Sequence, residues 1–193
     1  MEKKIIDSFF NNFDFSETAS MKMLELNLFK MFPKGTILIK EGDFTKYNYF
    51  ALKGSLREYR IMNGIEKTIE FYIEEEAIFS ESTLNGKPSE YYIVCESDCV
   101  LLRSSEKEEH IFRTNFPVID SFCNTFIKKE VVKRQSKYRN YSISNPEERY
   151  LNILQNKPYL LQRFSQYHIA SYIGVKPESL SRIKKRISKY VNT

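Results

Sequence analysis

The sequence predicts an α+β chain in three parts: a double-stranded β-helix (a jelly roll), then one long helix, then a small helical domain. Three observations support this order. Residues 36–102 are short runs of β-forming residues broken by glycines. Apolar residues at three- and four-residue steps follow them, as on one face of a helix. Residues 165–193 hold six basic residues and one acid, and so carry the whole net charge of +5.

The β-rich part contains one strong turn signal. Asn63-Gly64 separates two β-type runs, and this dipeptide accepts the positive φ that a two-residue hairpin needs at both turn positions. Many short strands at regular spacing are typical of a barrel or jelly roll. The expected strands are Thr36–Ile39, Tyr47–Leu52, Ser55–Met62, Ile65–Ile73, Tyr91–Cys95 and Cys99–Arg103.

Helical spacing marks both flanks of this part. At the N-terminus it includes Ile5, Phe9, Phe13, Met21, Leu24, Leu28 and Met31. From Glu106 the helical period returns, and we expect a long helix over 116–140 between domains at 1–115 and 141–193. This helix either joins two copies of the chain or packs on the chain's own β-domain. Its apolar stripe is Phe116, Ile119, Phe122, Phe126, Ile127 and Val131.

Composition and motifs narrow the functional classes. No segment approaches the roughly 20 apolar residues that span a bilayer, and Met1–Asp7 lacks the apolar core of a signal peptide. We therefore expect a cytoplasmic protein without a membrane partner. The sequence has no Gly-rich phosphate loop and no nucleophile motif. Its two histidines, His110 and His168, are too few for the metal set of cupin-type enzymes, so we expect neither an enzyme nor a metal site.

The three cysteines, Cys95, Cys99 and Cys123, fit a reducing compartment, because an odd number cannot form a fully paired disulfide framework within one chain. A metal or cluster site commonly needs four ligands, and the sequence offers no such set. Buried thiols and a redox-active thiol remain the two interpretations.

The last helical segment contains a helix-turn-helix pattern. Ser165 is a suitable N-cap for a short first helix. Gly174 supplies the turn, because the end of a helix favours the left-handed conformation that glycine adopts cheaply. Pro177 suits the first turn of a second helix. The predicted inner faces of the two helices are Ile169, Ala170, Ile173, Leu180, Ile183 and Ile187.

The outer face of the second helix indicates its use. Glu178, Ser181 and Arg182 supply a carboxylate, a hydroxyl and a guanidinium, the groups that hydrogen-bond base edges. Basic neighbours, Arg186 among them, can neutralise phosphates. A helical hairpin with the same core and no DNA to bind would not need this face. The predicted DNA-binding residues are Ser165, Lys176, Pro177, Glu178, Ser179, Ser181, Arg182, Lys184, Lys185 and Lys189.

Gln166–Ile187 resembles the helix-turn-helix of the Crp/Fnr family of bacterial regulators, above all in Ile-Ala-Ser-Tyr-Ile-Gly-Val and Glu-Ser-Leu-Ser-Arg. The resemblance extends over the chain, because the family places a cyclic-nucleotide-binding-like β-roll first, a dimerisation helix next and a winged-helix-like reader last. It implies a bacterial transcription regulator that binds double-stranded DNA as a homodimer, reads a near-palindromic operator and contacts RNA polymerase. Glu178, Ser181 and Arg182 match the base-reading residues of the Fnr-like branch.

The chain departs from the family pattern at the reader and at the sensor. Only Ser188–Thr193 follow the second helix, so we expect a truncated wing. Lys176 stands where the family commonly has Thr or Ser as an N-cap. In the sensor, Ser80 replaces the Gly of a Gly-Glu pair that receives ribose. Ser89 or Glu90 stands where an Arg pairs with the cyclic phosphate.

These substitutions remove the strongest bidentate phosphate group, and a carboxylate repels a phosphate, so we expect no response to cyclic AMP, although Lys87 could substitute for the Arg. Residues 1–94 contain no Cys, which argues against an Fnr-type iron–sulfur cluster, and we expect no cofactor. An effector of unknown identity would bind at Phe79, Ser80, Glu81, Ser89, Glu90 and Tyr91. The alternative function is a ligand-binding or scaffolding β-roll protein whose C-terminal helices contact other proteins.

Overall fold

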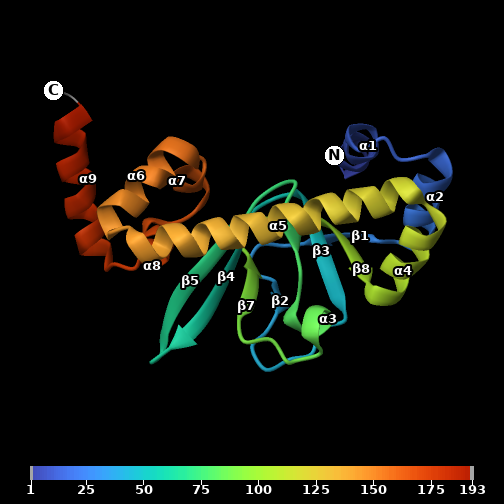
Figure 1. Cartoon of the computed structure of the whole chain (residues 1–193), viewed down its shortest axis with the longest axis horizontal. Helices are drawn as coiled ribbons and strands as arrows, with labels where there is room; N and C mark the ends of the chain where they lie inside the picture. Colours follow the sequence, from blue (N-terminus) through green and yellow to red (C-terminus); the bar gives the residue numbers. More distant parts are fainter. Residues whose placement is uncertain (1, 192–193) are drawn as a thin grey trace.

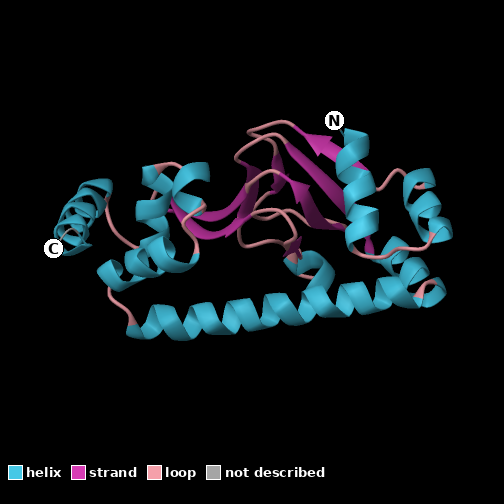
Figure 2. Cartoon of the chain, turned by 90° about the horizontal axis from the view of Figure 1, so that it is seen from above, coloured by secondary structure: helices cyan, strands magenta, loops and turns pink. Residues whose placement is uncertain are grey.

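The computed structural model describes residues 2–191, with the side chains of residues 3–188. A β-sandwich lies at the centre, with α1 (Glu2–Asn12) and α2 (Glu17–Glu25) at one end and the C-terminal helices at the other (Figure 1). One helix, α5 (Pro117–Ile143), runs along the length of the molecule beside the sandwich, as Figure 2 shows from above. The predicted α+β class is confirmed.

The sandwich consists of two four-stranded antiparallel sheets, as in a jelly roll. The side chains between the sheets, such as Leu56, Tyr72 and Ile93, are at most 1% exposed and form the core. One sheet has the spatial order β1 (Phe29–Phe32), β8 (Cys99–Ser105), β3 (Tyr47–Lys53) and β6 (Ala77–Ile78). The other has the order β2 (Ile37–Ile39), β7 (Tyr92–Cys95), β4 (Leu56–Met62) and β5 (Ile65–Tyr72).

The predicted hairpin is confirmed. Asn63 and Gly64 have φ of 52° and 75°, and they connect β4 to β5 with Met62 opposite Ile65. All six predicted strands occur, as β2, β3, β4, β5, β7 and β8. The short elements β1, β6 and α3 (Glu81–Asn85) are additions that the sequence pattern does not predict.

The prediction of helical structure up to Met31 is wrong. The chain leaves the helical region at Asn27, which has φ of 51°, and Met31 lies in β1, paired with β8. The regular spacing that suggested a helix is not the buried face of α2, because Met21 and Leu24 are 55% and 50% exposed. Pairing with β8 therefore decides the structure of this segment.

The long helix forms, but most of its predicted stripe faces inward. Ile119 and Phe126 are buried, and Phe116 and Phe122 are half-buried against the same apolar cluster. Phe122 packs edge-on against Phe50 of β3, with ring centroids 5.2 Å apart. The prediction that these four residues belong to a dimer interface is therefore wrong. They pack on the chain's own β-domain.

A short helix, α4 (Glu106–Asn115), leads from β8 into α5, and four helices follow α5. They are α6 (Pro146–Asn156), α7 (Leu160–Arg163), α8 (Gln166–Ile173) and α9 (Pro177–Val191). Within the described residues no strand follows α9, so the chain shows no wing up to Val191. None of the described helices is long and apolar enough to cross a membrane.

Candidate nucleic-acid interface

Helix α8 begins where the sequence predicts. Ser165 has the extended backbone of an N-cap, and its side chain accepts a hydrogen bond from the His168 amide at 3.2 Å. Ile169, Ala170 and Ile173 on the inner face are at most 1% exposed. These three side chains anchor α8 in the core of the C-terminal domain.

The turn after α8 is specified by glycine. Gly174 has φ of +83°, in the left-handed region that favours this residue. A Cβ atom at this position would lie 2.8 Å from Tyr141 Oη and 3.3 Å from Nη1 of Arg149. The turn therefore needs glycine both for its backbone angle and for the close approach of two side chains.

Helix α9 has one apolar face and one polar face. Leu180, Ile183 and Ile187 are buried against α6 to α8, as predicted. Of the predicted DNA-binding residues, Ser179 is half-buried, and the side chain of Lys189 lies outside the described residues. The exposed ones are Ser165, Lys176, Pro177, Glu178, Ser181, Arg182, Lys184 and Lys185.

Three exposed charged groups of α9 are free. In the part of the chain that the structure describes, Glu178, Arg182 and Lys185 have no hydrogen-bond or ion-pair partner. They are three or four residues apart and so share one face of α9. Ser181 lies on the same face, where its hydroxyl donates to the Pro177 carbonyl at 3.2 Å. This face can accept hydrogen bonds through a carboxylate and donate them through two cations.

Two other cations of α9 are engaged within the domain. Lys184 donates to Gln166 Oε1 at 3.0 Å, at the start of α8. Arg186, which the sequence suggests as a phosphate ligand, pairs with Glu147 of α6 at 2.5 Å. Arg186 therefore braces α9 against α6, and neither Lys184 nor Arg186 belongs to the free set of Glu178, Arg182 and Lys185.

The predicted effector residues lie around α3 and β7, and their polar groups bond to one another. Ser80 is fully buried and caps α3, because its Oγ accepts a hydrogen bond from the Thr83 amide at 3.1 Å. Ser89 Oγ donates to the Tyr91 carbonyl at 2.9 Å, and Tyr91 Oη donates to the Phe79 carbonyl at 3.1 Å. These groups hold the loop in shape.

Two carboxylates, Glu81 and Glu90, belong to the predicted effector site, and Glu90 lies where the resemblance places an arginine. The Glu81 carboxylate accepts a hydrogen bond from the Glu90 amide at 2.8 Å. The Glu90 carboxylate in turn pairs with Arg60 of β4 at 3.3 Å. Arg60 is therefore engaged by a carboxylate at this site.

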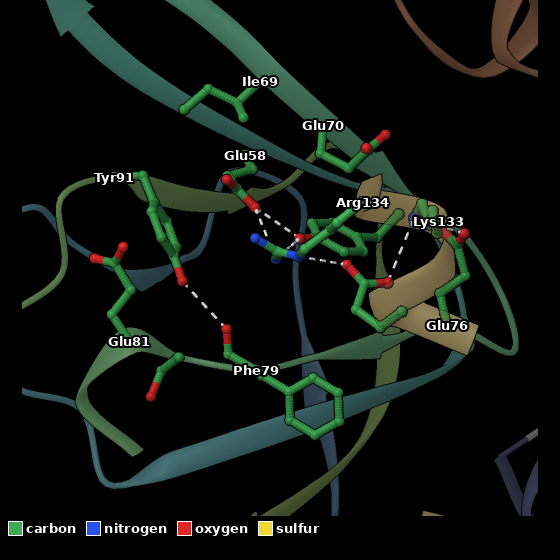
Figure 3. A network of polar contacts seen from close by, with 12 residues as sticks. Glu58, Ile69, Glu70, Glu76, Phe79, Glu81, Tyr91, Lys133 and Arg134 are labelled. Carbon is green, nitrogen blue, oxygen red and sulfur yellow. Dashed lines mark hydrogen bonds and ion pairs between the residues drawn. The ribbon is translucent and has the colours of Figure 1, made fainter. Parts of the chain in front are cut away.

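Charged groups fill the contact between the sandwich and α5 (Figure 3). Glu58 of β4 is 3% exposed, accepts a hydrogen bond from Tyr72 Oη at 2.6 Å and lies 4.0 Å from Arg134 of α5. Arg134 also pairs with Glu130 at 2.8 Å. Burial raises the pKa of the Glu58 carboxyl, and burial together with Glu58 raises the pKa of Tyr72.

Two lysines extend this network along α5. Lys133 pairs with Glu76 at 2.8 Å, and Lys137 pairs with Glu70 at 3.0 Å. Burial alone would lower the pKa of Lys133, but Glu70, Glu76 and Glu130 more than offset it and raise that pKa. The network gives α5 one register on the sandwich. The sequence pattern does not reveal it, because its members are spread over three distant segments.

The C-terminal domain packs on the β4–β5 hairpin of its own chain. The Thr68 amide of β5 donates to Ser171 Oγ of α8 at 2.9 Å. Phe71 of β5 belongs to the same apolar cluster as Leu180 of α9. The β-domain therefore supplies part of the core of the C-terminal domain.

The polar side of this seam is incompletely bonded. Arg57 of β4 pairs with Glu96 at 2.6 Å and with Glu66 at 2.8 Å, and His168 Nε2 of α8 lies 3.6 Å from Glu96. Among the described residues, the buried side-chain polar atoms without a hydrogen-bond partner are Arg57 Nη1, Thr68 Oγ1 and His168 Nδ1. All three belong to the hairpin or to α8. Burial, and then the Arg57 guanidinium, lowers the pKa of His168.

A second apolar stripe lies on the outward side of α5. Ile127, Val131, Tyr138 and Tyr141 are 37%, 50%, 77% and 45% exposed, with Arg134 between them. These positions follow one another at steps of four, three, four and three, the heptad spacing of a two-stranded coiled coil. Of the predicted dimer residues only Ile127 and Val131 belong to this stripe. The tyrosines are additions that the same spacing could have revealed.

The cysteines lie inside the β-domain or against it. Cys95 and Cys99 are buried in the sandwich core, where a hydrogen bond between their thiols raises the pKa of Cys95 and lowers that of Cys99. Cys123 of α5 is half-buried, and burial raises its pKa to about 11. The described residues contain no group of three or more His, Cys, Asp or Glu side chains placed to hold a metal ion.

Comparison with known proteins supports the architecture. Residues 29–113 match the family model of the cyclic nucleotide-binding domain. No curated protein sequence matches the chain. FixK2 from Bradyrhizobium japonicum is similar with 14% sequence identity and a TM-score of 0.69 over 84% of each chain.

Two further solved structures extend the comparison. The c-di-GMP-responsive global regulator CLP of Xanthomonas campestris is 17% identical, with a TM-score of 0.66 over 88% of this chain and 92% of that one. A Eubacterium rectale protein assigned to the crp/fnr family of transcriptional regulators is 16% identical, with a TM-score of 0.66 over 92% and 85%. The sandwich, the long helix and the C-terminal helices therefore share the fold of these proteins.

Proposed function

We propose that this chain is a transcription regulator that binds double-stranded DNA through α8 and α9 as a homodimer. The proposal rests on the match to the cyclic nucleotide-binding domain and on the fold that the chain shares with solved Crp/Fnr regulators. A promoter-bound regulator of this kind has RNA polymerase as its expected protein partner. The proposal includes no catalysed reaction, because the sequence has no Gly-rich phosphate loop and no nucleophile motif.

The observation that carries the proposal is the free polar face of α9. Glu178, Arg182 and Lys185 are exposed and unpartnered among the described residues, above a face buried through Leu180 and Ile183. An exposed guanidinium on such a helix can bond guanine O6 and N7, and a carboxylate can accept from cytosine N4. A helix that served only to pack the domain would gain nothing from leaving these charges unpaired.

The outward stripe of α5 supports the homodimer. Its residues from Ile127 to Tyr141 have coiled-coil spacing and are exposed in the single chain. A second copy of α5 would bury them about a two-fold axis. Two recognition helices related by that axis would lie roughly one turn of DNA apart, which explains why a near-palindromic site is expected.

The sensor is proposed to work without cyclic AMP. Glu90 would face the phosphate, and Arg60 is already paired with Glu90. The ionic network of Glu58, Arg134 and Glu130 connects α5 to the sandwich through the chain's own groups. Such a regulator would bind DNA without an effector, and the amount of the protein would control its activity.

The test is selection of bound fragments from random-sequence DNA by the purified protein at near-physiological salt, with and without cyclic AMP. The expected result is one two-fold symmetric site in both conditions, with affinity that falls steeply as salt rises. Enrichment only with cyclic AMP would contradict the constitutive part. If no DNA site is enriched, and the protein instead binds other proteins with an affinity that does not change with salt, the scaffolding alternative is favoured.

A further inference from the structure

Arg149 stands in the first turn of α6, where a positive charge is unfavourable for the dipole of its own helix. Its guanidinium instead reaches the ends of two other helices. One nitrogen, Nη2, donates to the carbonyls of Tyr141 at 2.9 Å and Ser144 at 2.8 Å, at the C-terminal end of α5. The other, Nη1, donates to the carbonyl of Ile173 at 3.1 Å, at the C-terminal end of α8.

The surroundings of the Arg149 guanidinium fix its orientation. It stacks over the ring of Tyr141, with Cζ 3.5 Å from the ring centroid. Gly174 leaves room for it, because a Cβ atom there would approach Nη1 to 3.3 Å and Tyr141 Oη to 2.8 Å. Carbonyls in the last turn of a helix lack intrahelical partners and carry the negative end of the helix dipole. A planar cation that hydrogen-bonds the C-terminal ends of α5 and α8 at once is therefore favourable.

Open space lies between the end of α5 and the C-terminal domain. Cavities of about 710 Å³ and 700 Å³ lie beside the last turns of α5, and both are lined by Glu70, Lys137, Tyr141 and Tyr172. Lys137 lies over the ring of Tyr172, with Nζ 4.8 Å from the ring centroid. Because this space is open, the contacts of Arg149 hold much of the position of α5 relative to the C-terminal domain.

We propose that Arg149 is the positioning residue that fixes the angle between α5 and the helix-turn-helix, and so the separation of the two recognition helices in the dimer. This inference rests on the proposed function. Tyr141 belongs to the outward stripe of α5, and Ile173 is the last residue of α8, one short turn before α9. Arg149 thus connects the outward stripe of α5 to the turn that precedes the recognition helix.

The first experiment uses Arg149→Met, which keeps the aliphatic stem and removes the donors. The matched control is Arg139→Met on the same end of α5, because among the described residues the Arg139 side chain bonds only Ser136 of its own helix, at 3.4 Å. Affinity is measured for operators whose half-sites are moved by one or two base pairs, each of which rotates one half-site by about 35°.

Wild type and Arg139→Met are expected to bind one spacing best and to lose affinity steeply on either side. Arg149→Met is expected to bind the best spacing on the order of tenfold more weakly and to have a flatter profile. A variant that is merely less stable would lose affinity by the same factor at every spacing. An Arg149→Met profile as sharp as that of wild type would overturn the proposal.

The second experiment needs no DNA. Spin labels on Lys128→Cys of α5 and Ser188→Cys of α9, both exposed positions, report the distance between the helices in a Cys123→Ser background. Dilution with unlabelled protein removes distances between protomers. The distribution is expected to be narrow in wild type and in Arg139→Met, and broad in Arg149→Met and in Tyr141→Leu, which removes the stacked ring.

The two experiments separate the two claims. If wild type binds no DNA, the proposed function fails, and the label distances still decide the role of Arg149. If Arg149→Met keeps the narrow distribution of wild type, the positioning role fails whatever the protein binds. Arg149→Lys adds a check, because a single ammonium lacks the planar fork and should not restore the narrow distribution.

Discussion

Phe71 of β5 and Phe164, which precedes α8, lie with their ring centroids 4.1 Å apart. Phe71 is 3% exposed and belongs to the apolar core of the C-terminal domain, although it comes from the β-sandwich. The β-domain and the C-terminal domain therefore share the core around Phe71, and the two domains of a single chain should unfold together.

Phe71→Ala should break this connection. The loss of a buried phenyl ring costs about 3–5 kcal/mol of the free energy of unfolding, because the cavity is not refilled. Calorimetry is expected to give one transition for the wild type and two for the variant. The control is Phe44→Ala, since Phe44 is 68% exposed and its replacement should change stability by less than about 0.5 kcal/mol. Equal losses in the two variants would show that Phe71 does not couple the domains.

Val131→Asp should dissociate the proposed dimer. Val131 is 50% exposed in the outward stripe of α5, and a buried unpaired carboxylate at a coiled-coil position is strongly unfavourable. Light scattering at micromolar concentration is expected to change from twice 23.0 kDa to 23.0 kDa. Thr125→Asp, at an exposed position of the same helix outside the stripe, should leave the mass unchanged. A monomeric wild type would contradict the two-fold model.

Arg182→Ala should change sequence preference. Replacement of a guanidinium that bonds a guanine edge costs about 1–3 kcal/mol at that base pair and relaxes the preference there. Lys185→Ala is the comparison, because loss of a phosphate contact should weaken binding to all sequences alike and reduce the salt slope by about one. Binding measured on a panel of single-base variants of the selected operator distinguishes the two patterns. An unchanged panel for Arg182→Ala would remove this residue from the base-reading face.

His168 should make the protein less stable in mild acid. Burial, and then Arg57, holds the pKa of His168 below its ordinary value of 6.5. As the pH falls through about 6.5, the unfolded chain therefore takes up the proton before the folded chain does, and the free energy of unfolding falls until the lowered pKa is reached. Urea unfolding between pH 7.5 and about pH 5 should show a shallower fall for His168→Gln than for wild type.

The control for this measurement replaces the exposed His110 of α4 by glutamine. If His110→Gln and His168→Gln alter the profile equally, the acid sensitivity does not come from the seam between the sandwich and α8. A profile for His168→Gln that coincides with wild type would have the same meaning.

The sequence by itself determined the features that depend on a few neighbouring residues. Ser165 caps α8 through the amide three residues later, and Gly174 ends it because of its own backbone angle. Asn63-Gly64 forms the hairpin turn because both residues accept positive φ. The strands, the helices α8 and α9 and the exposed face of α9 follow from such local preferences together with apolar periodicity.

Only the tertiary structure decided which equivalent groups face which partner. Phe122 and Val131 are both apolar residues of α5, but the rings of α1 and β3 cover Phe122 and leave Val131 exposed. Arg182 and Arg186 are one turn apart on α9, yet Glu147 of α6 engages only Arg186. Burial and charge pairing depend on what the rest of the chain brings near, and a periodic pattern records only the helix that carries the residue.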